Sequence, residues 1–484
     1  MNIQTLISVG PELVLFALAV VVILLGAFRS RVGRSPQSEG AGGSAVAWLT
    51  LLGFIAAFAA TFGVPEGTFV FNDLYEQDAL ALFAKRLFIA SAAISLFGSM
   101  TLRHRAFRDR SAEYHFALVV SVLGMSVLAS ARELILLFVG FELMSIPLFL
   151  LTGFIKRDPV APEAALKFFL VGTASSAIIV YGMSFVYGVT GTTMIDAIPQ
   201  ALADGHPLMM LGMGLLLAGI GFKIAAFPFH MWAPDTYEAA TTPFVAWLSV
   251  APKAAGFVAL IRLYVEGVGE ASLVWMPAVS VLAGMTMVIG NLMAIPQQNI
   301  KRMLAYSGVA HIGYMLLALA AFSSSGIAMM LFYLVAYMFG NMGAFLVVEA
   351  VAQSEQSEGM EAYRGLAQRS PLLALSMLIF LLSLGGIPFV AGFWAKLYVF
   401  WAAIERGMYG LVFLGALLTV VALYYYLLVA RRMYIEPPDT PEPVQVAMPL
   451  RFAILGCLVG VVGMGAYPAP WVTLAQRVAA TLFS

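Results

Sequence analysis

Charged side chains stand inside stretches of this sequence that are otherwise apolar. Lys223 lies in "LAGIGFKIAAFPFHMW", and Glu142 lies at the centre of "LLFVGFELMSIPLFLL". Lys167, Lys253 and Lys396 have comparable apolar surroundings. A lysine removed from water gives up its proton more readily, and a nearby carboxylate favours its charged form. These residue types in this setting therefore predict a series of groups that hold protons and pass them on.

Proline residues stand close to these charges. Pro228 follows Lys223 by five residues, and Pro388 precedes Lys396 by eight. A proline inside a helix removes one backbone donor and leaves the carbonyl four residues earlier without its partner. In lipid such a carbonyl needs a protein or water partner, so broken helices are expected to line hydrated cavities. Transporters build ion sites near the middle of the membrane in this way. An ordinary membrane-helix kink is the alternative.

Each charge also has a plain structural explanation. Lys167 lies four residues after Glu163, so it can pair with that carboxylate or extend toward the membrane surface. Lys396 can reach the surface if its helix ends early, and the other three charges can form structural ion pairs. One charged side chain near the bilayer centre costs about 3 kcal/mol unless it is paired or hydrated. A chain that only anchors a complex has no reason to bear that cost five times, which favours the proton path.

His311, in "YSGVAHIGYMLLALA", is a candidate proton relay because an unperturbed histidine titrates near neutrality. A core histidine bonded to a backbone carbonyl is the alternative. The sequence contains no His/Glu cluster with metal-ligand spacing and no glycine-rich nucleotide loop after a strand. Its one cysteine, Cys457, excludes an internal disulfide and a thiolate cluster. We therefore expect no metal, nucleotide, flavin or iron–sulfur site in this chain.

The composition places these residues in an all-α polytopic membrane protein. Of 484 residues, 61% are hydrophobic and 11% are charged, against about 25% charged residues in soluble proteins. The mean hydropathy is +0.92. The formal net charge is zero, so nothing indicates a nucleic-acid partner. No Lys or Arg precedes the first apolar run, which predicts an uncleaved first span in place of a signal peptide.

About 20 apolar residues are needed to cross a bilayer, and the sequence contains fourteen such runs. The run at 371–403 is too long for one straight span and contains "SLGGIP", so we expect a broken helix there. The predicted spans are 11–28, 45–63, 80–102, 114–131, 134–155, 163–188, 207–230, 241–265, 272–295, 302–322, 326–350, 371–403, 408–430 and 447–468.

The positive charges of the short loops are distributed unequally between the two sides of the membrane. If the N-terminus lies outside, the inner side carries most of the Lys and Arg residues, as the positive-inside rule requires. The outer side holds little beyond Arg132, Arg406 and Arg477. Both termini are therefore predicted to face the outer, periplasm-like side. The predicted inner-side charges are Arg29, Arg31, Arg34, Arg103, Arg105, Arg108, Arg110, Lys156, Arg157, Lys301, Arg302, Arg364, Arg369, Arg431, Arg432 and Arg451.

Three stretches carry a family resemblance: "GFKIAAFPFHMWAPDTYEAATTP", "NLMAIPQQNIKRMLAYSGVAHIGYMLL" and "LSLGGIPFVAGFWAKLYVF". Together they resemble the antiporter-like membrane subunits of respiratory complex I, which are related to subunits of multi-subunit sodium/proton antiporters. The resemblance covers roughly residues 114–432. The chain ends soon after the fourteenth run, without the long lateral helix of the L-type subunit. It also has Lys396 where the M-type subunit would have a glutamate.

The resemblance implies an internal repeat of two five-helix units, the second inverted relative to the first because five is an odd number. Each unit would contain one broken helix, here around Pro228 and Pro388. The implied division is 1–110 for the first three transmembrane helices, 111–268 for the first five-helix unit, 269–435 for the inverted second unit, and 436–484 for the fourteenth helix.

The resemblance also implies roles for the buried charges. Glu142 is similar to the family's glutamate of the fifth span, and Lys167, Lys223 and Lys253 match the lysines of spans six to eight. Lys396 matches the lysine of span twelve. Lys223 would stay charged while Glu142 faces it and would lose its proton when Glu142 moves away or is neutralised. That proton would pass through water or His311 toward Lys253 and Lys396, and then leave.

The drive for this movement would come from NADH-to-quinone electron transfer in partner subunits, which would hold FMN, the iron–sulfur clusters and the quinone. The implied partners are the lipid bilayer, neighbouring subunits of the M and K types and the lateral helix of the L-type subunit. The implied location is the bacterial plasma membrane.

Two alternative functions remain. A cation/proton antiporter subunit would need a sodium site, for which the sequence has no dense carboxylate cluster. A non-transporting structural subunit would keep its charges only as ion pairs.

Overall fold

The computed structural model describes residues 3–31, 41–102, 107, 109–156, 160–203, 206–267, 272–439 and 441–483. Within them, twelve helices are long and apolar enough to cross a membrane, and two shorter apolar helices cover Ala45–Ala60 and Pro371–Gly385. The predicted class, an all-α polytopic membrane protein, is thereby confirmed. Several of the arginines used to predict the orientation lie outside the described residues: Arg34, Arg103, Arg105, Arg108 and Arg157.

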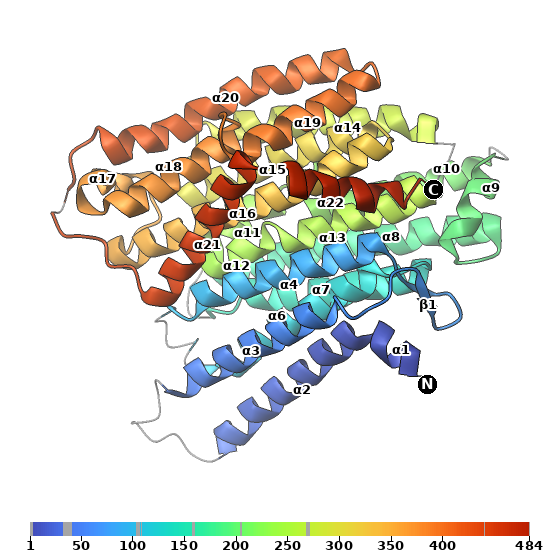
Figure 1. Cartoon of the computed structure of the whole chain (residues 1–484), viewed down its shortest axis with the longest axis horizontal. Coiled ribbons are helices and arrows are strands. Elements are labelled where there is room, and N and C mark those ends of the chain that lie inside the picture. Colours follow the sequence, from blue (N-terminus) through green and yellow to red (C-terminus); the bar gives the residue numbers. More distant parts are fainter. Residues whose placement is uncertain are drawn as a thin grey trace. The chain divides into compact units, whose positions relative to one another are not determined.

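The chain divides into two compact units, and Figure 1 labels their helices. The first contains Met1–Lys223 and Ala251–Ala271, and the second contains Ile224–Val250 and Ser272–Ser484. After Lys223 the chain leaves the first unit and contributes 27 residues, 224–250, to the second unit. It then returns to the first unit for residues 251–271, and from Ser272 onward it belongs to the second unit. Lys223 and Lys253 stand on either side of this excursion and both belong to the first unit.

The first unit is a bundle built around the antiparallel pair α6 and α7, with α2 and α3 beside them. Glycine makes the α6–α7 contact close, since a Cβ added to Gly124 would lie 2.4 Å from the backbone nitrogen of Met144. Small residues of this kind let membrane helices approach each other closely. The helices are α1 (Ile3–Ser8), α2 (Gly10–Arg31), α3 (Ala41–Ala60), α4 (Ala79–Ser99), α6 (Ser111–Ala129), α7 (Leu134–Thr152), α8 (Val160–Thr190), α9 (Ile198–Ala203), α10 (Pro207–Ile224), α13 (Ala251–Leu260), the 3-10 turn η2 (Ile195–Ala197) and the π-helical turn η3 (Ile261–Glu266).

A short β-hairpin connects α3 to α4 and is the only sheet in the described part of the chain. Its strands are β1 (Thr68–Val70) and β2 (Tyr75–Gln77), paired antiparallel. The hairpin is fixed to the segment that follows α6, because the Glu76 N–H donates to the Ser130 carbonyl at 2.8 Å. Its last residues thereby reach the ends of α4 and α6.

The second unit surrounds α16, which packs against α12, α15, α18, α19, α21 and α22. The sequence predicted no helix after the fourteenth span, but the structure adds the twelve-residue α22 there. The helices are α11 (Trp232–Ala239), α12 (Thr242–Leu248), α14 (Ser272–Ala294), α15 (Ile300–Ala320), α16 (Ser324–Glu355), α17 (Leu366–Arg369), α18 (Pro371–Gly385), α19 (Ala391–Glu405), α20 (Tyr409–Tyr434), α21 (Met448–Ala466), α22 (Ala469–Ala480) and the 3-10 turn η5 (Met360–Tyr363).

Two interruptions contain the prolines that the sequence singled out. Pro228 lies between the end of α10 and the start of α11, and Pro388 lies between α18 and α19. At the second interruption Gly386 has φ +79° and its N–H bonds back to the Ser383 carbonyl, a glycine cap that ends α18. A Cβ on Gly386 would also lie 2.9 Å from Cδ of Lys396. Glycine is thus required both by the backbone conformation and by the lysine beside it.

A third interruption was not predicted. The run 241–265 contains α12 and α13, separated by Ser249 and Val250. Pro252 stands in the first turn of α13, where its missing N–H needs no partner. The break places Lys253 in the first turn of α13 and not in the middle of a continuous helix.

Candidate functional site

Glu142 and Lys223 meet inside the first unit. The Lys223 Nζ lies 3.5 Å from the Glu142 Oε1 and donates to the Ser145 Oγ at 2.8 Å. The Ser176 Oγ donates to the same Glu142 oxygen at 2.6 Å. The Lys223 side chain is 3% exposed and that of Glu142 is 27% exposed. Three helices, α7, α8 and α10, therefore converge on one buried lysine–carboxylate pair.

This geometry suits a lysine that changes its protonation state. At 3.5 Å the contact is longer than an N–H···O hydrogen bond, so Glu142 can move away without breaking a short bond to Lys223. The Ser145 hydroxyl can accept from an ammonium and can also donate to a neutral amine. Lys223 also lies one residue before α10 ends, where unpaired helix carbonyls favour a positive charge. The site can hold the charged lysine without a tight ion pair.

Lys167 has a different environment from Lys223. Its Nζ pairs with Glu163 Oε1 at 2.9 Å, one helical turn away on α8, and its side chain is 52% exposed. This is the pairing that the sequence left open as the structural alternative. Any contribution of Lys167 to proton movement stays a prediction.

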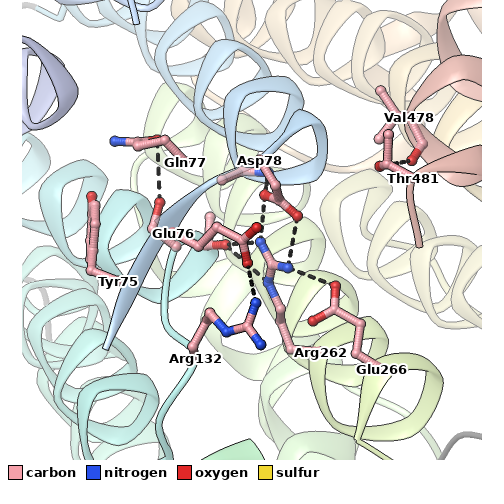
Figure 2. A network of polar contacts seen from close by, with 12 residues as sticks. Tyr75, Glu76, Gln77, Asp78, Arg132, Arg262, Glu266, Val478 and Thr481 are labelled. Atoms are coloured by element: carbon pink, nitrogen blue, oxygen red, sulfur yellow. Dashed lines mark hydrogen bonds and ion pairs between the residues drawn. The ribbon is translucent and has the colours of Figure 1, made fainter. Parts of the chain in front are cut away.

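Lys253 is buried in the first unit. It is 1% exposed, and its helix α13 packs against α4 and α6. Beyond it, Arg262 on η3 donates to both oxygens of Asp78 at 2.6 and 2.8 Å and to Glu266 at 2.6 Å (Figure 2). The Ala129 carbonyl accepts from the same guanidinium at 2.9 Å. Arg262 therefore fixes the segment that carries Lys253 to the start of α4 and the end of α6.

His311 lies among tyrosines in the second unit. Its Nδ1 is 2.7 Å from the Tyr333 hydroxyl and its Nε2 is 3.3 Å from the Tyr426 hydroxyl. The Tyr426 hydroxyl continues to that of Ser307. Hydroxyl groups both donate and accept, so this row tolerates either tautomer of the imidazole and its protonated form. The arrangement is suitable for relaying a proton.

Lys396 is buried at the second helix interruption, with 4% of its surface exposed. Its Nζ lies 3.4 Å from the Gly385 carbonyl at the end of α18 and 4.8 Å from the centre of the Tyr314 ring. Tyr314 also borders His311, with ring centroids 6.1 Å apart. Among the described residues, no carboxylate lies within 4.0 Å of Lys396 in an ion pair. Neither a structural salt bridge nor an exposed side chain accounts for this lysine.

The predicted residues thus fall into two groups, one in each unit. The first contains Glu142, Lys167, Lys223 and Lys253, and the second contains His311 and Lys396. Sequence reasoning missed Lys85 on α4, which is fully buried. A lysine within the predicted span 80–102 meets the criterion that selected the other four, so the signal was present and was overlooked. The tyrosines around His311 gave no signal, because buried aromatic residues are common in any apolar helix.

The described residues contain no group of three or more His, Cys, Asp or Glu side chains that could hold a metal ion. Hydroxyl groups instead accompany the Glu142–Lys223 pair and the row that contains His311. Such an arrangement can hold and move protons.

Comparison with known families identifies the family to which a chain with this arrangement belongs. Residues 131–422 match the family described as NADH:quinone oxidoreductase/Mrp antiporter, transmembrane. The chain belongs to this antiporter family. All six predicted proton-path residues and both prolines lie within the matched region, and the expected resemblance to antiporter-like subunits of complex I is confirmed.

Relatives of this antiporter family match the chain along nearly its whole length. NADH-quinone oxidoreductase subunit N of Moorella thermoacetica is 42% identical over 451 residues, covering 93% of this chain and 94% of the relative. F(420)H(2) dehydrogenase subunit N of Methanosarcina mazei is 38% identical, covering 99% of each. A chain in a structure of respiratory complex I from Thermus thermophilus with bound aureothin is similar, with TM-score 0.79 and 32% identity. That alignment covers 96% of this chain and 99% of the other.

Proposed function

We propose that this chain is a proton-translocating membrane subunit of an NADH-quinone oxidoreductase, equivalent to subunit N. The observation that carries the proposal is the 42% identity to a subunit N over 93% of the chain. The buried lysine–carboxylate pair and the histidine–tyrosine row support it, because each provides groups that can exchange a proton. The chain acts as part of an oxidoreductase and contributes the proton-moving part of the reaction.

The proposed movement begins at Glu142 and Lys223. While Glu142 is ionised and near, the Lys223 ammonium has a counter-charge. When Glu142 gains a proton or moves away, the ammonium remains buried without that counter-charge, and loss of its proton becomes favourable. Lys253 is the next acceptor, and His311 and Lys396 carry the proton toward the exit. The structural argument for Lys396 is that no ion pair in the described part of the chain holds its charge.

Electron transfer takes place in partner subunits under this proposal. FMN, iron–sulfur clusters and quinone are held there, and the change that displaces Glu142 is transmitted through the membrane subunits. The neighbours that we propose are the M-type and K-type subunits and the lateral helix of the L-type subunit. The similarity to F(420)H(2) dehydrogenase subunit N indicates that the partner subunits, and not this chain, determine the electron donor.

A subunit of a multi-subunit cation/proton antiporter is the second candidate, because the matched family also includes the Mrp antiporters. That function requires a site for the second cation. The described residues offer no cluster of three or more acidic or metal-ligating side chains for it. The oxidoreductase subunit is therefore the better-supported function.

Purification of the tagged chain from its native membranes tests the proposal. We expect it to co-purify with flavin-containing and iron–sulfur subunits, and the preparation to reduce quinone with NADH. In vesicles the same reaction should acidify one compartment, measured with a pH-gradient dye. Co-purification with antiporter subunits alone, without flavin or iron, would contradict the proposed function and support the second candidate.

The proposed topology has fourteen spans, two inverted five-helix units and both termini on the periplasmic side of the bacterial plasma membrane. Reporter fusions test it. A fusion at residue 106 should report the cytoplasmic side, since the surrounding loop carries a concentration of arginine, and a C-terminal fusion should report the periplasmic side. A periplasmic signal at residue 106 would rule out this topology.

A further inference from the structure

A second buried lysine–glutamate pair lies outside the region that matches the antiporter family. The Lys85 Nζ on α4 is 2.7 Å from the Glu12 Oε1 on α2. The Lys85 side chain is fully buried and that of Glu12 is 10% exposed. Both residues precede residue 131, where the family match begins. Both members of this pair therefore belong to the N-terminal helices α2 and α4.

Lys85 has a hydrogen-bond acceptor for each of its three N–H donors in addition to the ion pair with Glu12. Besides Glu12, the Gln77 Oε1 lies at 2.6 Å, the Ser130 Oγ at 2.7 Å and the Tyr75 hydroxyl at 3.2 Å from its Nζ. The three N–H donors of the ammonium are therefore engaged by Gln77, Ser130 and Tyr75. Two of the oxygens belong to hydroxyls, which can donate as well as accept. These hydroxyls can therefore reorient toward a neutral amine without leaving it unbonded.

The site repeats the chemistry of the Lys223 site. Each contains a buried lysine, a glutamate from a different helix that is more exposed than the lysine, and a serine hydroxyl within 2.8 Å of the lysine nitrogen. The glutamate is closer in the N-terminal site, at 2.7 Å against 3.5 Å. At that distance a proton can be exchanged between Nζ and Oε1 once one N–H of the ammonium is directed at the carboxylate.

We propose that Glu12 and Lys85 form a further proton-exchange site in the first unit, an inference that rests on the proposed function. One proton passes from the Lys85 ammonium to the Glu12 carboxylate, leaving a neutral amine and a neutral carboxylic acid. The acid then releases the proton through its exposed edge, and the amine takes up another. No bond other than N–H and O–H forms or breaks, so the step needs no oxidant or reductant.

The hairpin links this site to the helix that carries Lys253. Gln77 bonds Lys85, and the next residue, Asp78, holds Arg262 with both carboxylate oxygens (Figure 2). Gln77 also donates to the Ser8 carbonyl at 2.6 Å, which fixes its side chain from the other side. A change at Lys85 therefore acts on the strand end that positions Arg262, η3 and α13.

The test is the double variant Glu12→Gln/Lys85→Met in the complete complex. Replacing both members of a buried ion pair with neutral groups of similar size is often tolerated, so we expect assembly and NADH oxidation to persist. We expect the number of protons translocated per NADH oxidised to fall below half of the wild-type value. The matched control is Glu355→Gln/Arg369→Met, which removes an ion pair between the last residue of the candidate span Ser324–Glu355 and the short helix α17, and should leave that ratio unchanged.

Lys223→Ala, measured in parallel, separates this inference from the proposed function. A wild-type ratio in the double variant, together with loss of translocation in Lys223→Ala, would overturn the Glu12–Lys85 site alone. Wild-type ratios in both would overturn the proposed function as well.

Infrared difference spectroscopy provides a second measurement if the double variant does not assemble. On adding NADH, the wild-type complex should show the carbonyl band of a protonated carboxyl group, shifted in D2O and missing in Glu12→Gln. This variant keeps Lys85 bonded to Gln77, Ser130 and Tyr75. The same spectrum in wild type and in Glu12→Gln would show that Glu12 does not change protonation, and would overturn the proposal.

Discussion

Lys223→Ala is expected to leave the complex assembled and to abolish most of its proton translocation. Removing the side chain takes away the group that Ser145 and Glu142 hold at the end of α10. Glu142 keeps its hydrogen bond from Ser176 and is partly exposed, so it is not left as an unpaired buried charge. A positioned acid–base group contributes roughly 10²-fold or more to a proton transfer, and we expect translocation to fall by about tenfold at least. The measurement is a pH-gradient dye in vesicles during NADH oxidation, normalised to assembled complex.

Lys167→Ala is the matched control for this experiment, because it makes the same chemical change at an exposed lysine. Lys167 pairs with Glu163 within one helix, and an exposed i,i+4 pair contributes little to stability. We expect Lys167→Ala to retain most of the translocation. Equal, near-normal translocation in both variants would show that the Glu142–Lys223 pair is only structural.

The helices could be predicted from the sequence because the bilayer imposes a minimum length on every apolar span. The run 326–350 corresponds to α16, Ser324–Glu355, with ends moved by a few residues. The run 207–230 was predicted too long, since α10 ends at Ile224 and Ala225 takes φ +60°. Hydropathy continues through the interruption, so only Pro228 marked it. Periodic apolar residues locate a helix, but its end depends on backbone geometry that hydropathy does not measure.

The Glu142–Lys223 contact could be anticipated because the cost of isolated charge in a membrane favours pairing. The same argument could have identified Lys85 as a buried charge that needs a partner, but it could not have identified Glu12 as that partner. Glu12 lies 73 positions earlier, at the beginning of the predicted first span. A carboxylate at that position is expected simply as a residue at the start of a helix. Ser130 and Gln77 come from the end of α6 and from the hairpin. Only the folded chain brings these segments together, and no spacing rule relates them.

Lys223 and Lys396, the two lysines proposed for the ends of the path, differ in the groups that stabilise their positive charge. Lys223 has a carboxylate 3.5 Å away, whereas Lys396 has one distant carbonyl and an aromatic face. An aromatic face stabilises a cation by about 0.5–2 kcal/mol, less than a buried ammonium requires. The charged form of Lys396 is therefore supported weakly, which suits a group that must release its proton. The same reasoning predicts what a permanent charge would do there.

Lys396→Arg is expected to assemble and to lose most of its coupled proton translocation, approaching the level of Lys396→Ala. The guanidinium keeps its proton under all conditions of turnover, so it supplies the positive charge but cannot release a proton. The result should be measured as NADH-driven quinone reduction together with the pH-gradient signal, both normalised to assembled complex. Lys301→Arg is the matched control in the same unit. Lys301 is also buried, but it pairs with Glu358 at 2.7 Å and donates to the Ala240 carbonyl at 2.8 Å. A fixed charge should suffice there, so this variant should keep its translocation.

Comparing the arginine variant with a methionine variant separates the effect of charge at position 396 from the effect of side-chain size. Lys396 Cδ lies 2.9 Å from the position that a Cβ on Gly386 would occupy, so space beside the helix interruption is limited. Lys396→Met, which is neutral and of similar length to lysine, removes the charge without adding bulk. If proton release is the role of Lys396, both the arginine and the methionine variants fail, although one keeps the charge and the other keeps the shape. Near wild-type translocation by the arginine variant, with the methionine and alanine variants inactive, would mean that Lys396 supplies only fixed charge. The exit of the path would then have to be sought elsewhere in the second unit, beginning with His311 and its tyrosines.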